Sequence, residues 1–325
     1  MNALTFPLLR FLSDGCYRDV DEIVGALKVS AKEVEEVLEE VRSLGGEVEF
    51  DTAGKCRLRR RLAWLDKQEI EQCLGKQSSA FRIEVVDHTG STNDDLMMSA
   101  RQGGASGLVR AAELQTAGRG RRQRTWHSGF GGALTFSLLW VFDRGPAALY
   151  GLSLVVGVSL LRSLRAVGVP DVMLKWPNDV LWRQRKVGGV LIESSGSISE
   201  AARAVIGIGL NLHLSGTVVD RIDQAASDLH TAGLCVGRNQ LLGQVLLDLR
   251  EVLDTFSRDG FAPFKAEWEH AHAYQDKMVQ IAPADGKKEE GRVIGVDDDG
   301  ALLLSVDGKP RRYHGGEVSM RSSGA

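Results

Sequence analysis

The pattern of hydrophobic and polar residues changes twice along this chain, which divides it into three parts. In the first sixty residues the apolar positions recur every three or four residues, which is the spacing of one helix face. The clearest stripe consists of Val34, Val37, Leu38 and Val41. Capping pairs three residues apart, Asp19 with Glu22 and Ser30 with Glu33, predict two helix starts. This part of the chain is therefore expected to be helical.

Two short β segments follow the helices. Gly45 and Gly46 end the second helix, and residues 47–51 and 55–60 flank a turn, which predicts a hairpin. Two helices followed by a hairpin are typical of a winged helix-turn-helix domain, expected over residues 1–64. Residues 65–80 contain a short helical pattern and then a Gly- and Ser-containing stretch, and we expect a linker there.

From residue 81 the pattern mixes strands and helices. Strands are expected at 81–87, 107–114, 133–140, 172–176, 187–193 and 204–212. Helices are expected at 92–102, 147–167 and 239–258, and residues 180–191 resemble a hairpin. Because strands and helices do not alternate strictly, this pattern favours a mixed α+β sheet over a doubly wound parallel one. We expect this central domain to span residues 81–274.

The spacing changes again after residue 274. Short strands are expected at 278–282, 292–296, 301–306 and 311–313, divided by Asp-Gly pairs at 285–286, 299–300 and 307–308. A small β barrel over residues 275–325 is the natural interpretation. The expected fold class is α+β with three domains.

Composition narrows the function. The chain has 325 residues, 43% of them hydrophobic, and a net charge of −3, which describes a soluble globular protein that does not coat nucleic acid indiscriminately. We find no run of eighteen apolar residues and no secretory signal, so the cytoplasm is the expected compartment. The four cysteines stand far apart and are expected to be free thiols, and the spacing of His270 and His272 does not favour a metal site.

The most informative segment is residues 118–126, which we call the arginine loop. Four arginines and two glycines occupy residues 118–124, and Trp126 follows. Glycine lets the backbone approach a ligand, and guanidinium groups match phosphate oxygens. The indole suits stacking on a base or covering an apolar part of a ligand. The loop therefore predicts a phosphate-bearing ligand, with a solvated basic loop as the alternative.

Other phosphate-binding motifs are missing from the sequence. There is no G-x-x-x-x-G-K-S/T motif, and residues 207–211 lack the third glycine of a dinucleotide fingerprint. The turn Pro177-Asn178-Asp179 carries an amide and a carboxylate suited to orient phosphate or magnesium, although these residues are also ordinary turn formers.

Two further clusters carry candidate chemistry. Lys186 begins an apolar strand with Gly188 and Gly189 behind it, so it is a candidate point charge on a carboxylate or phosphate, or else a surface lysine. Ser91-Thr92-Asn93 opens a helix after a strand, where hydroxyls and free N–H groups can receive a polar ligand, or where Ser91 simply caps the helix.

Taken together and in this order, these motifs resemble the bacterial biotin protein ligases, in the bifunctional form that also represses the biotin operon. The resemblance covers the whole chain and is most specific at the arginine loop and at residues 175–179, 186–193 and 207–211. It implies a winged helix-turn-helix domain, a central catalytic domain like those of class II aminoacyl-tRNA synthetases, and a C-terminal SH3-like barrel.

The resemblance also implies a two-step reaction. The carboxylate of biotin attacks the α-phosphorus of ATP, with Mg²⁺, to give biotinyl-AMP and pyrophosphate. A lysine of the biotin carboxyl carrier protein of acetyl-CoA carboxylase then attacks this mixed anhydride. The rival ligase class, lipoate or octanoate ligases, usually lacks the winged domain and this arginine loop. A non-catalytic regulator that binds a small effector is the alternative from a different class.

Site residues follow from the same resemblance. The biotin-binding positions are Ser91, Thr92, Asn93, Gln115, Arg119, Gly120, Arg121 and Lys186. The positions for ATP and the adenylate are Arg119, Arg121, Arg122, Arg124, Trp126, Asn178, Asp179, Lys186 and Asn211. Arg121 and Lys186 are the expected catalytic residues, because they neutralise charge as two anions meet. Asp179 is the candidate magnesium contact, through the phosphates.

Two features depart from the family pattern. Gln123 stands where a glycine is common, which is expected to stiffen the arginine loop. Residues 31–42, the expected DNA-reading helix, carry five glutamates and a net charge of −3, which opposes binding between rows of phosphates. Five cations at residues 55–61 of the wing are the possible compensation. The candidate DNA contacts are Ser30, Ala31, Lys32, Lys55 and Arg57. By analogy with relatives, residues 190–193 are a candidate edge for a homodimer.

Overall fold

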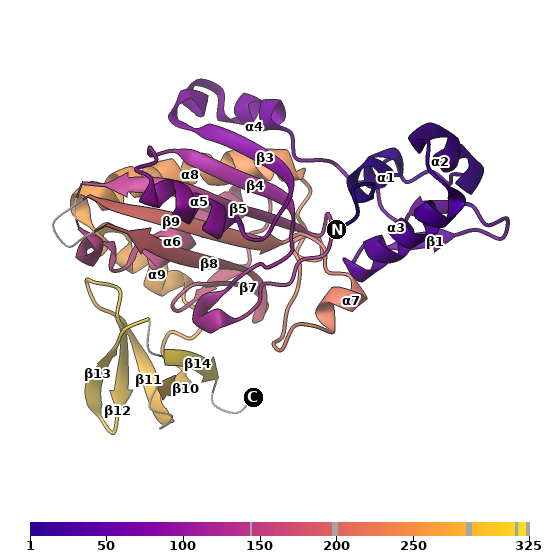
Figure 1. Ribbon diagram of the computed structural model, residues 1–325. Coiled ribbons are helices and arrows are strands. Elements are labelled where there is room, and N and C mark those ends of the chain that lie inside the picture. The colour runs from indigo at the N-terminus through magenta and orange to yellow at the C-terminus, as the bar shows by residue number, and fades with distance from the viewer. Residues whose placement is uncertain (144, 197–200, 284–287, 316–317, 323–325) are drawn as a thin grey trace.

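The computed structural model describes all residues except 144, 197–200, 284–287, 316–317 and 323–325. A small N-terminal helical part, a central sheet flanked by helices and a small C-terminal sheet follow one another along the chain (Figure 1). The predicted central mixed sheet and the small C-terminal sheet are confirmed at this level.

The N-terminal part contains three helices and a two-stranded antiparallel hairpin. These are α1 (Thr5–Phe11), α2 (Val20–Leu27), α3 (Ala31–Ser43), β1 (Val48–Phe50) and β2 (Cys56–Leu58). Both predicted helix starts are present: Asp19 caps α2, and Ser30 with Glu33 forms a full capping box on α3. The sequence pattern missed α1, which is only seven residues long and has no side-chain cap.

The central sheet has seven strands in the order β3-β4-β5-β9-β8-β7-β6. Their bounds are β3 (Arg82–Thr89), β4 (Leu108–Gln115), β5 (Ala133–Phe142), β6 (Val172–Lys175), β7 (Asp179–Trp182), β8 (Arg185–Ser195) and β9 (Ala202–Asn211). Only β3 and β4 pair in parallel among these neighbours. The mixed sheet, and the hairpin of β7 and β8 within it, agree with the predicted pattern.

Helices cover both faces of this sheet (Figure 1). The helix α5 (Thr92–Arg101) packs on one face, and α6 (Leu152–Ala166) and α8 (Arg238–Asp259) lie on the other. The remaining short helices are α7 (Gly216–Val219) and α9 (Lys265–Ala271), with 3-10 turns at Gly75–Ala80, Arg121–Gln123, Pro146–Leu149 and Ala262–Phe264. The stretch Pro146–Ala166 is long and apolar enough to cross a membrane, but 61% of its most apolar window is buried, as in the core helix of a globular domain.

Residues 65–80 differ from the predicted linker. They form α4 (Lys67–Leu74) and a 3-10 turn, and Ile70 is fully buried in the core of the central domain. At Gly243 of α8, an added Cβ would lie 2.5 Å from the Cβ of Cys73, so the two helices pack very closely. Residues 75–80 are polar and have no buried side chain, which is why the sequence predicted a linker. The residues that pack into the core belong to α4, just before them.

The C-terminal sheet has the strand order β13-β12-β11-β10-β14. Its strands are β10 (Met278–Pro283), β11 (Glu289–Val296), β12 (Leu302–Val306), β13 (Lys309–Tyr313) and β14 (Val318–Ser322). Gly300 and Gly308 have positive φ, as the two Asp-Gly turns require; the pair at 285–286 lies outside the described residues. The indole N–H of Trp176 donates to the carbonyl of Gly300 at 3.1 Å, which ties this sheet to the central domain.

Candidate active site

A cavity of about 980 Å³ opens between the arginine loop, the start of α5 and strands β8 and β9. All fourteen residues predicted to contact biotin, ATP or the adenylate line it. They are Ser91, Thr92, Asn93, Gln115, Arg119, Gly120, Arg121, Arg122, Arg124, Trp126, Asn178, Asp179, Lys186 and Asn211. Side chains from distant parts of the sequence thus share one cavity.

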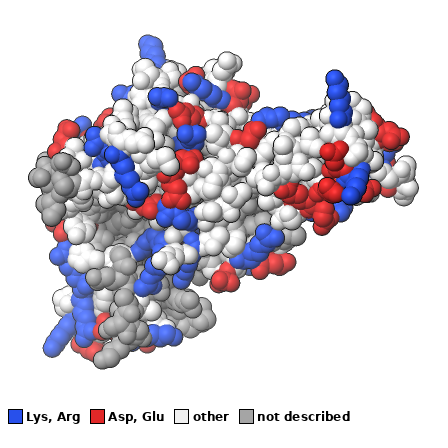
Figure 2. All heavy atoms as spheres, in the orientation of Figure 1, with Lys and Arg blue, Asp and Glu red and all other residues white. Residues whose placement is uncertain are grey.

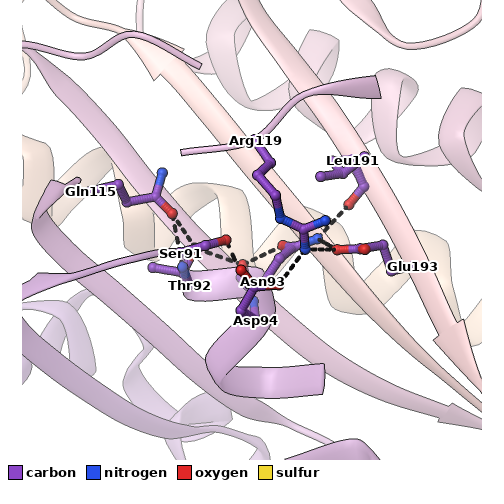
Figure 3. A network of polar contacts seen from close by, with 9 residues as sticks. Ser91, Thr92, Asn93, Asp94, Gln115, Arg119, Leu191 and Glu193 are labelled. Atoms are coloured by element: carbon purple, nitrogen blue, oxygen red, sulfur yellow. Dashed lines mark hydrogen bonds and ion pairs between the residues drawn. The ribbon is translucent and has the colours of Figure 1, made fainter. Parts of the chain in front are cut away.

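One end of the cavity is a chain of polar contacts (Figure 3). The side-chain carbonyl of Gln115 accepts from the backbone N–H of Thr92 at 2.8 Å. The hydroxyls of Thr92 and Ser137 lie 2.7 Å apart, and Ser137 donates to Oδ1 of Asn93 at 2.6 Å. Sequence reasoning missed Ser137, whose only signal is that it is one of two hydroxyl residues, with Thr135, in the otherwise apolar strand β5. The chain fixes the orientation of three candidate ligand-binding side chains.

The two glycines of Gly207-x-Gly209 have a packing role. A Cβ at Gly207 would lie 2.1 Å from Oδ1 of Asn93, and one at Gly209 would lie 2.6 Å from Cε2 of Trp126. Real Cβ atoms do not approach other atoms this closely, so these positions admit only glycine unless the neighbours move. The pair leaves room for Asn93 and for the indole of the arginine loop, which explains the motif without a dinucleotide.

Lys186 points into the cavity and is not a surface lysine. Its side chain is 17% exposed, and Nζ lies 2.6 Å from Oδ1 of Asp179, which is 16% exposed. A Cβ at Gly189 would lie 3.1 Å from Nζ, so the glycine provides the space that the lysine occupies. Nζ also lies 5.7 Å from the centre of the Trp126 ring. The ammonium is therefore held between a carboxylate and an aromatic face.

The arginine loop is folded over the cavity. The backbone N–H of Gly120 donates to the carbonyl of Arg124 at 2.7 Å, and that of Trp126 donates to Gly118 at 2.9 Å. Between these bonds, Arg122 and Gln123 both have positive φ, at 56° and 59°. Gln123, which we expected to stiffen the loop, therefore adopts a backbone conformation that glycine adopts more easily.

The arginines of this loop have different partners. Arg121 donates to Oδ1 of Asn178 at 3.2 Å, and burial lowers the pKa of its guanidinium. Arg119 instead donates to two carboxylates, Asp94 at 2.5 Å and Glu193 at 2.8 Å. Glu193 and Asp94 were not among the predicted site residues. Arg121 is therefore better placed than Arg119 to meet a phosphate.

The polar residues at the other end are tied to the backbone. Nδ2 of Asn178 donates to the carbonyl of Val190 at 2.7 Å, and Nδ2 of Asn211 donates to that of Ser227 at 3.1 Å. Asp179, the candidate magnesium contact, is paired with Lys186. No group of three or more His, Cys, Asp or Glu side chains converges within the described part of the chain. The donor set does not fit a cation site made by the protein alone.

The candidate DNA contacts lie on the surface of the N-terminal part, away from this cavity. Figure 2 shows acidic side chains gathered on the lobe that contains α3. Lys32 is 84% exposed and lies 3.7 Å from Glu36. Arg57 forms an ion pair with Glu49 of β1 at 2.8 Å. Arg59 pairs with Glu47 and Glu49, and Arg60 pairs with Glu47, the residue before β1. The expected compensation by wing cations is therefore reduced by local ion pairs.

The N-terminal part contacts the rim of the cavity. Arg221, which lines the cavity, donates to the carbonyl of Ser43 at the end of α3 at 3.2 Å. Phe130, just after the arginine loop, is buried in the core formed by α1, α3 and β2, and its N–H donates to Leu44 at 3.2 Å. Segments on both sides of the cavity are thus fixed to the N-terminal helices.

Known proteins share the sequence pattern of the central and C-terminal parts. Residues 84–211 match the Biotin/lipoate A/B protein ligase family, and residues 276–321 match the Biotin protein ligase C terminal domain. The bifunctional ligase/repressor BirA of Salmonella typhimurium is 35% identical over 99% of this chain and 100% of its own length. The chain belongs to the biotin protein ligase family. The bifunctional ligase/repressor BirA of Escherichia coli is 33% identical over 99% of the chain and 98% of its own length.

A solved structure agrees with this membership. The biotin protein ligase from Aquifex aeolicus in complex with biotin and ATP superposes with a TM-score of 0.63 at 29% identity. The superposition covers 74% of this chain and 98% of the other. The family predicted from the motifs is therefore confirmed, together with its central mixed sheet and small C-terminal sheet.

Proposed function

We propose that the protein is an ATP-dependent biotin protein ligase that forms biotinyl-AMP and transfers biotin to a lysine of the biotin carboxyl carrier protein of acetyl-CoA carboxylase. The main support is the arrangement of the cavity. A chain of neutral hydrogen-bonding groups, Thr92, Asn93 and Gln115, lies at one end, and Arg121 and Lys186 lie at the other. This arrangement suits a ligand with an uncharged polar ring and an anionic tail.

The geometry suits the first chemical step. When an oxygen of the biotin carboxylate bonds to the α-phosphorus, pyrophosphate leaves with the electron pair of the broken P–O bond. Two anions must approach, and the partly buried cations Arg121 and Lys186 offset their repulsion more strongly than they would in water. Lys186 keeps Asp179 as its partner until a ligand oxygen replaces it.

The second step needs protection of the anhydride. The acceptor lysine, as a neutral amine, attacks the carbonyl carbon, AMP leaves, and the amine loses its proton. A closed arginine loop with Trp126 against Gly209 excludes water from this intermediate. Because the protein offers no complete cation site of its own among the described residues, we propose that Mg²⁺ enters as the magnesium complex of ATP, with Asp179 near the phosphates.

Exchange of labelled pyrophosphate into ATP tests the activity. We expect exchange that depends on biotin, and biotin attached to a purified carrier domain on streptavidin blots. Lipoate and octanoate serve as competing substrates. Exchange driven by lipoate or octanoate and none driven by biotin would reverse the assignment, whereas ligand binding with no exchange would favour a non-catalytic regulator.

We also propose that the N-terminal part is a winged helix-turn-helix that binds operator DNA. Support comes from the repressor names of the full-length relatives and from the order α2, α3 and hairpin. The acidic α3 and the paired wing arginines oppose it. A gel-shift titration with the upstream DNA of the biotin genes, with biotin and ATP, provides the test. No shift at micromolar protein in low salt would leave a protein-interaction module as the alternative.

Assembly and domain limits are further parts of the proposal. Residues 191–195 of β8 pair with β9 on one side, whereas the pairing with β7 ends at Gly189. This supports residues 191–193 of the candidate homodimer edge 190–193, whereas Val190 is bonded to Asn178. Sedimentation with and without biotinyl-AMP would test the edge. We propose domains at 1–64, 81–274 and 275–325, with α4 of residues 65–80 packed on the second domain. We also propose that the second domain is like class II aminoacyl-tRNA synthetases, that the third is SH3-like, and that the protein is cytoplasmic.

A further inference from the structure

Glu193 lies near the end of β8, beside Asn93 of α5 and Arg119 of the arginine loop (Figure 3). One carboxylate oxygen, Oε2, accepts two hydrogen bonds. The donors are Nδ2 of Asn93 at 2.8 Å and Nη2 of Arg119 at 2.8 Å. The first donor belongs to α5 and the second to the loop. A single oxygen atom therefore joins two elements that both line the cavity.

Asn93 has little freedom around this contact. Its side-chain oxygen accepts from Ser137 at 2.6 Å, and its Nδ2 also lies 3.3 Å from the carbonyl of Leu191. The residue is 4% exposed, and the missing side chain at Gly207 leaves the space for its amide. Without the carboxylate, only the long contact to Leu191 would hold Nδ2. Glu193 therefore accepts the shorter of the two Nδ2 bonds and, together with Ser137, fixes which way the amide faces.

Arg119 is fastened from two sides. Glu193 binds it from β8, and Asp94, in the first turn of α5, binds it from the other side at 2.5 Å. The Asp94 side chain is 59% exposed and that of Glu193 only 27%, so solvent screens the second bond less. The loop can open only when the guanidinium leaves both carboxylates.

We propose that Glu193 is a positioning residue for the ligase reaction: it orients Asn93 and retains the arginine loop in its closed position through Arg119. This role rests on the proposed function. Charge-assisted bonds of this kind exceed neutral ones in strength, so Glu193→Gln keeps the shape of the side chain and weakens the link to the loop. The expected defect is in holding biotin and biotinyl-AMP, with the chemical step little changed.

The test compares Glu193→Gln with Glu84→Gln in biotin-dependent pyrophosphate exchange. Glu84 is a matched control, because its side chain is also 27% exposed and pairs with Arg82 and Arg110. We expect Glu193→Gln to raise KM for biotin about tenfold with kcat nearly unchanged. Biotinyl-AMP should also escape faster, read as more AMP released per biotin transferred. The control should match the wild type.

A double-variant cycle with Arg119→Gln separates this role from a merely structural one. If Glu193 acts in part through Arg119, the effect of the double variant should be smaller than the sum of the two single effects, because both single variants break the same link. Additive effects, or a Glu193→Gln enzyme equal to the control, would overturn the proposal. If Glu193→Gln does not fold, Asp94→Asn provides the test, because Asp94 is the other carboxylate that binds Arg119. We expect this variant to raise KM for biotin about two- to fivefold. An unchanged KM would count against the proposal. A wild type without biotin-dependent exchange would refute the proposed function instead.

Discussion

The indole of Trp126 lies against the backbone of Gly209, at a distance that leaves no room for a side chain on β9. An added Cβ would lie 2.6 Å from Cε2 and from Cζ2 of the ring. The arginine loop therefore packs its largest side chain directly on the backbone of β9. The position of the loop depends on the absence of a side chain at residue 209 as well as on the loop's own residues.

Gly209→Ala is expected to weaken binding of biotinyl-AMP about tenfold or more, because overpacking of this kind costs about 1–3 kcal/mol and here displaces the indole. Isothermal titration with biotinyl-AMP measures the change. Gly25→Ala is the control, since an added Cβ there meets nothing within 4 Å. Unchanged affinity in Gly209→Ala would mean that the ligand does not need the indole in this place.

Lys186→Gln is expected to slow adenylate formation about 100-fold in single-turnover experiments, because a positioned cation is lost where charge develops. Lys186→Arg should not rescue it, since Gly189 leaves space for a narrow ammonium only. Lys265→Gln, which breaks a more exposed 2.9 Å ion pair with Asp298 away from the cavity, should leave the rate unchanged. A Lys186→Arg enzyme at the wild-type rate would contradict this reasoning.

Gln123→Val should open the arginine loop, whereas Gln123→Gly should be tolerated. A β-branched residue is strongly disfavoured at a φ of 59°, and glycine is not. Trypsin cleaves after the loop arginines only when the loop opens, so its initial rate measures the effect, and we expect about a tenfold increase for Gln123→Val. Gln102→Val, at a φ of −88°, is the control. Equal rates for the two Gln123 variants would argue against strain at this position.

Buried His272 should make the folded protein sensitive to mild acid. It stacks on Trp268 with ring centres 4.6 Å apart, and burial, aided by Lys277, lowers its pKa to about 3. A histidine in the unfolded chain titrates near 6.5, so from about pH 6.5 down to about 3 the unfolded state binds a proton that the folded state does not. The free energy of unfolding therefore falls as the pH drops through this window.

Urea unfolding at pH 7.5 and pH 5.5 measures this effect. His272→Phe, which retains an aromatic ring on Trp268, should lose less stability between the two pH values than the wild type. His314→Gln, at an exposed position, should behave like the wild type. An identical pH dependence in His272→Phe would assign the acid sensitivity to other groups.

Removal of the wing glutamates should strengthen DNA binding if the N-terminal part is a repressor domain. Glu47→Gln with Glu49→Gln releases Arg57, Arg59 and Arg60 from their ion pairs. Each additional ion pair between an arginine and a phosphate should steepen the dependence of log K on log salt by about 0.9. A remote pair with the same charge change, Glu251→Gln with Asp254→Asn on α8, controls for net charge. Equal salt slopes would place the wing away from DNA.

The sequence predicted what depends on local pattern. The Ser30 capping box, the strands of the central sheet and the Asp-Gly turns at 299–300 and 307–308 all follow from residues a few positions apart. The motifs also identified the family, and the fourteen residues predicted to contact a ligand line one cavity.

Contacts between distant segments were not predictable in this way. Ser137, Asp94 and Glu193 look like ordinary strand and helix residues until folding brings them beside Asn93 and Arg119. Likewise, α4 was mistaken for part of a linker, because nothing in its own sequence shows that α8 offers Gly243 as its packing partner. Local pattern specifies elements, and long-range packing decides which side chains meet.

Phe130 and Leu114 belong by sequence to the central domain, yet both lie in the apolar core of the N-terminal helices. The boundary between the two domains in the sequence is therefore not a boundary in the packing. A chain cut after residue 64 would lose more than a DNA-binding module. It would expose two large apolar side chains of the central domain to solvent, and such an exposed apolar patch favours aggregation.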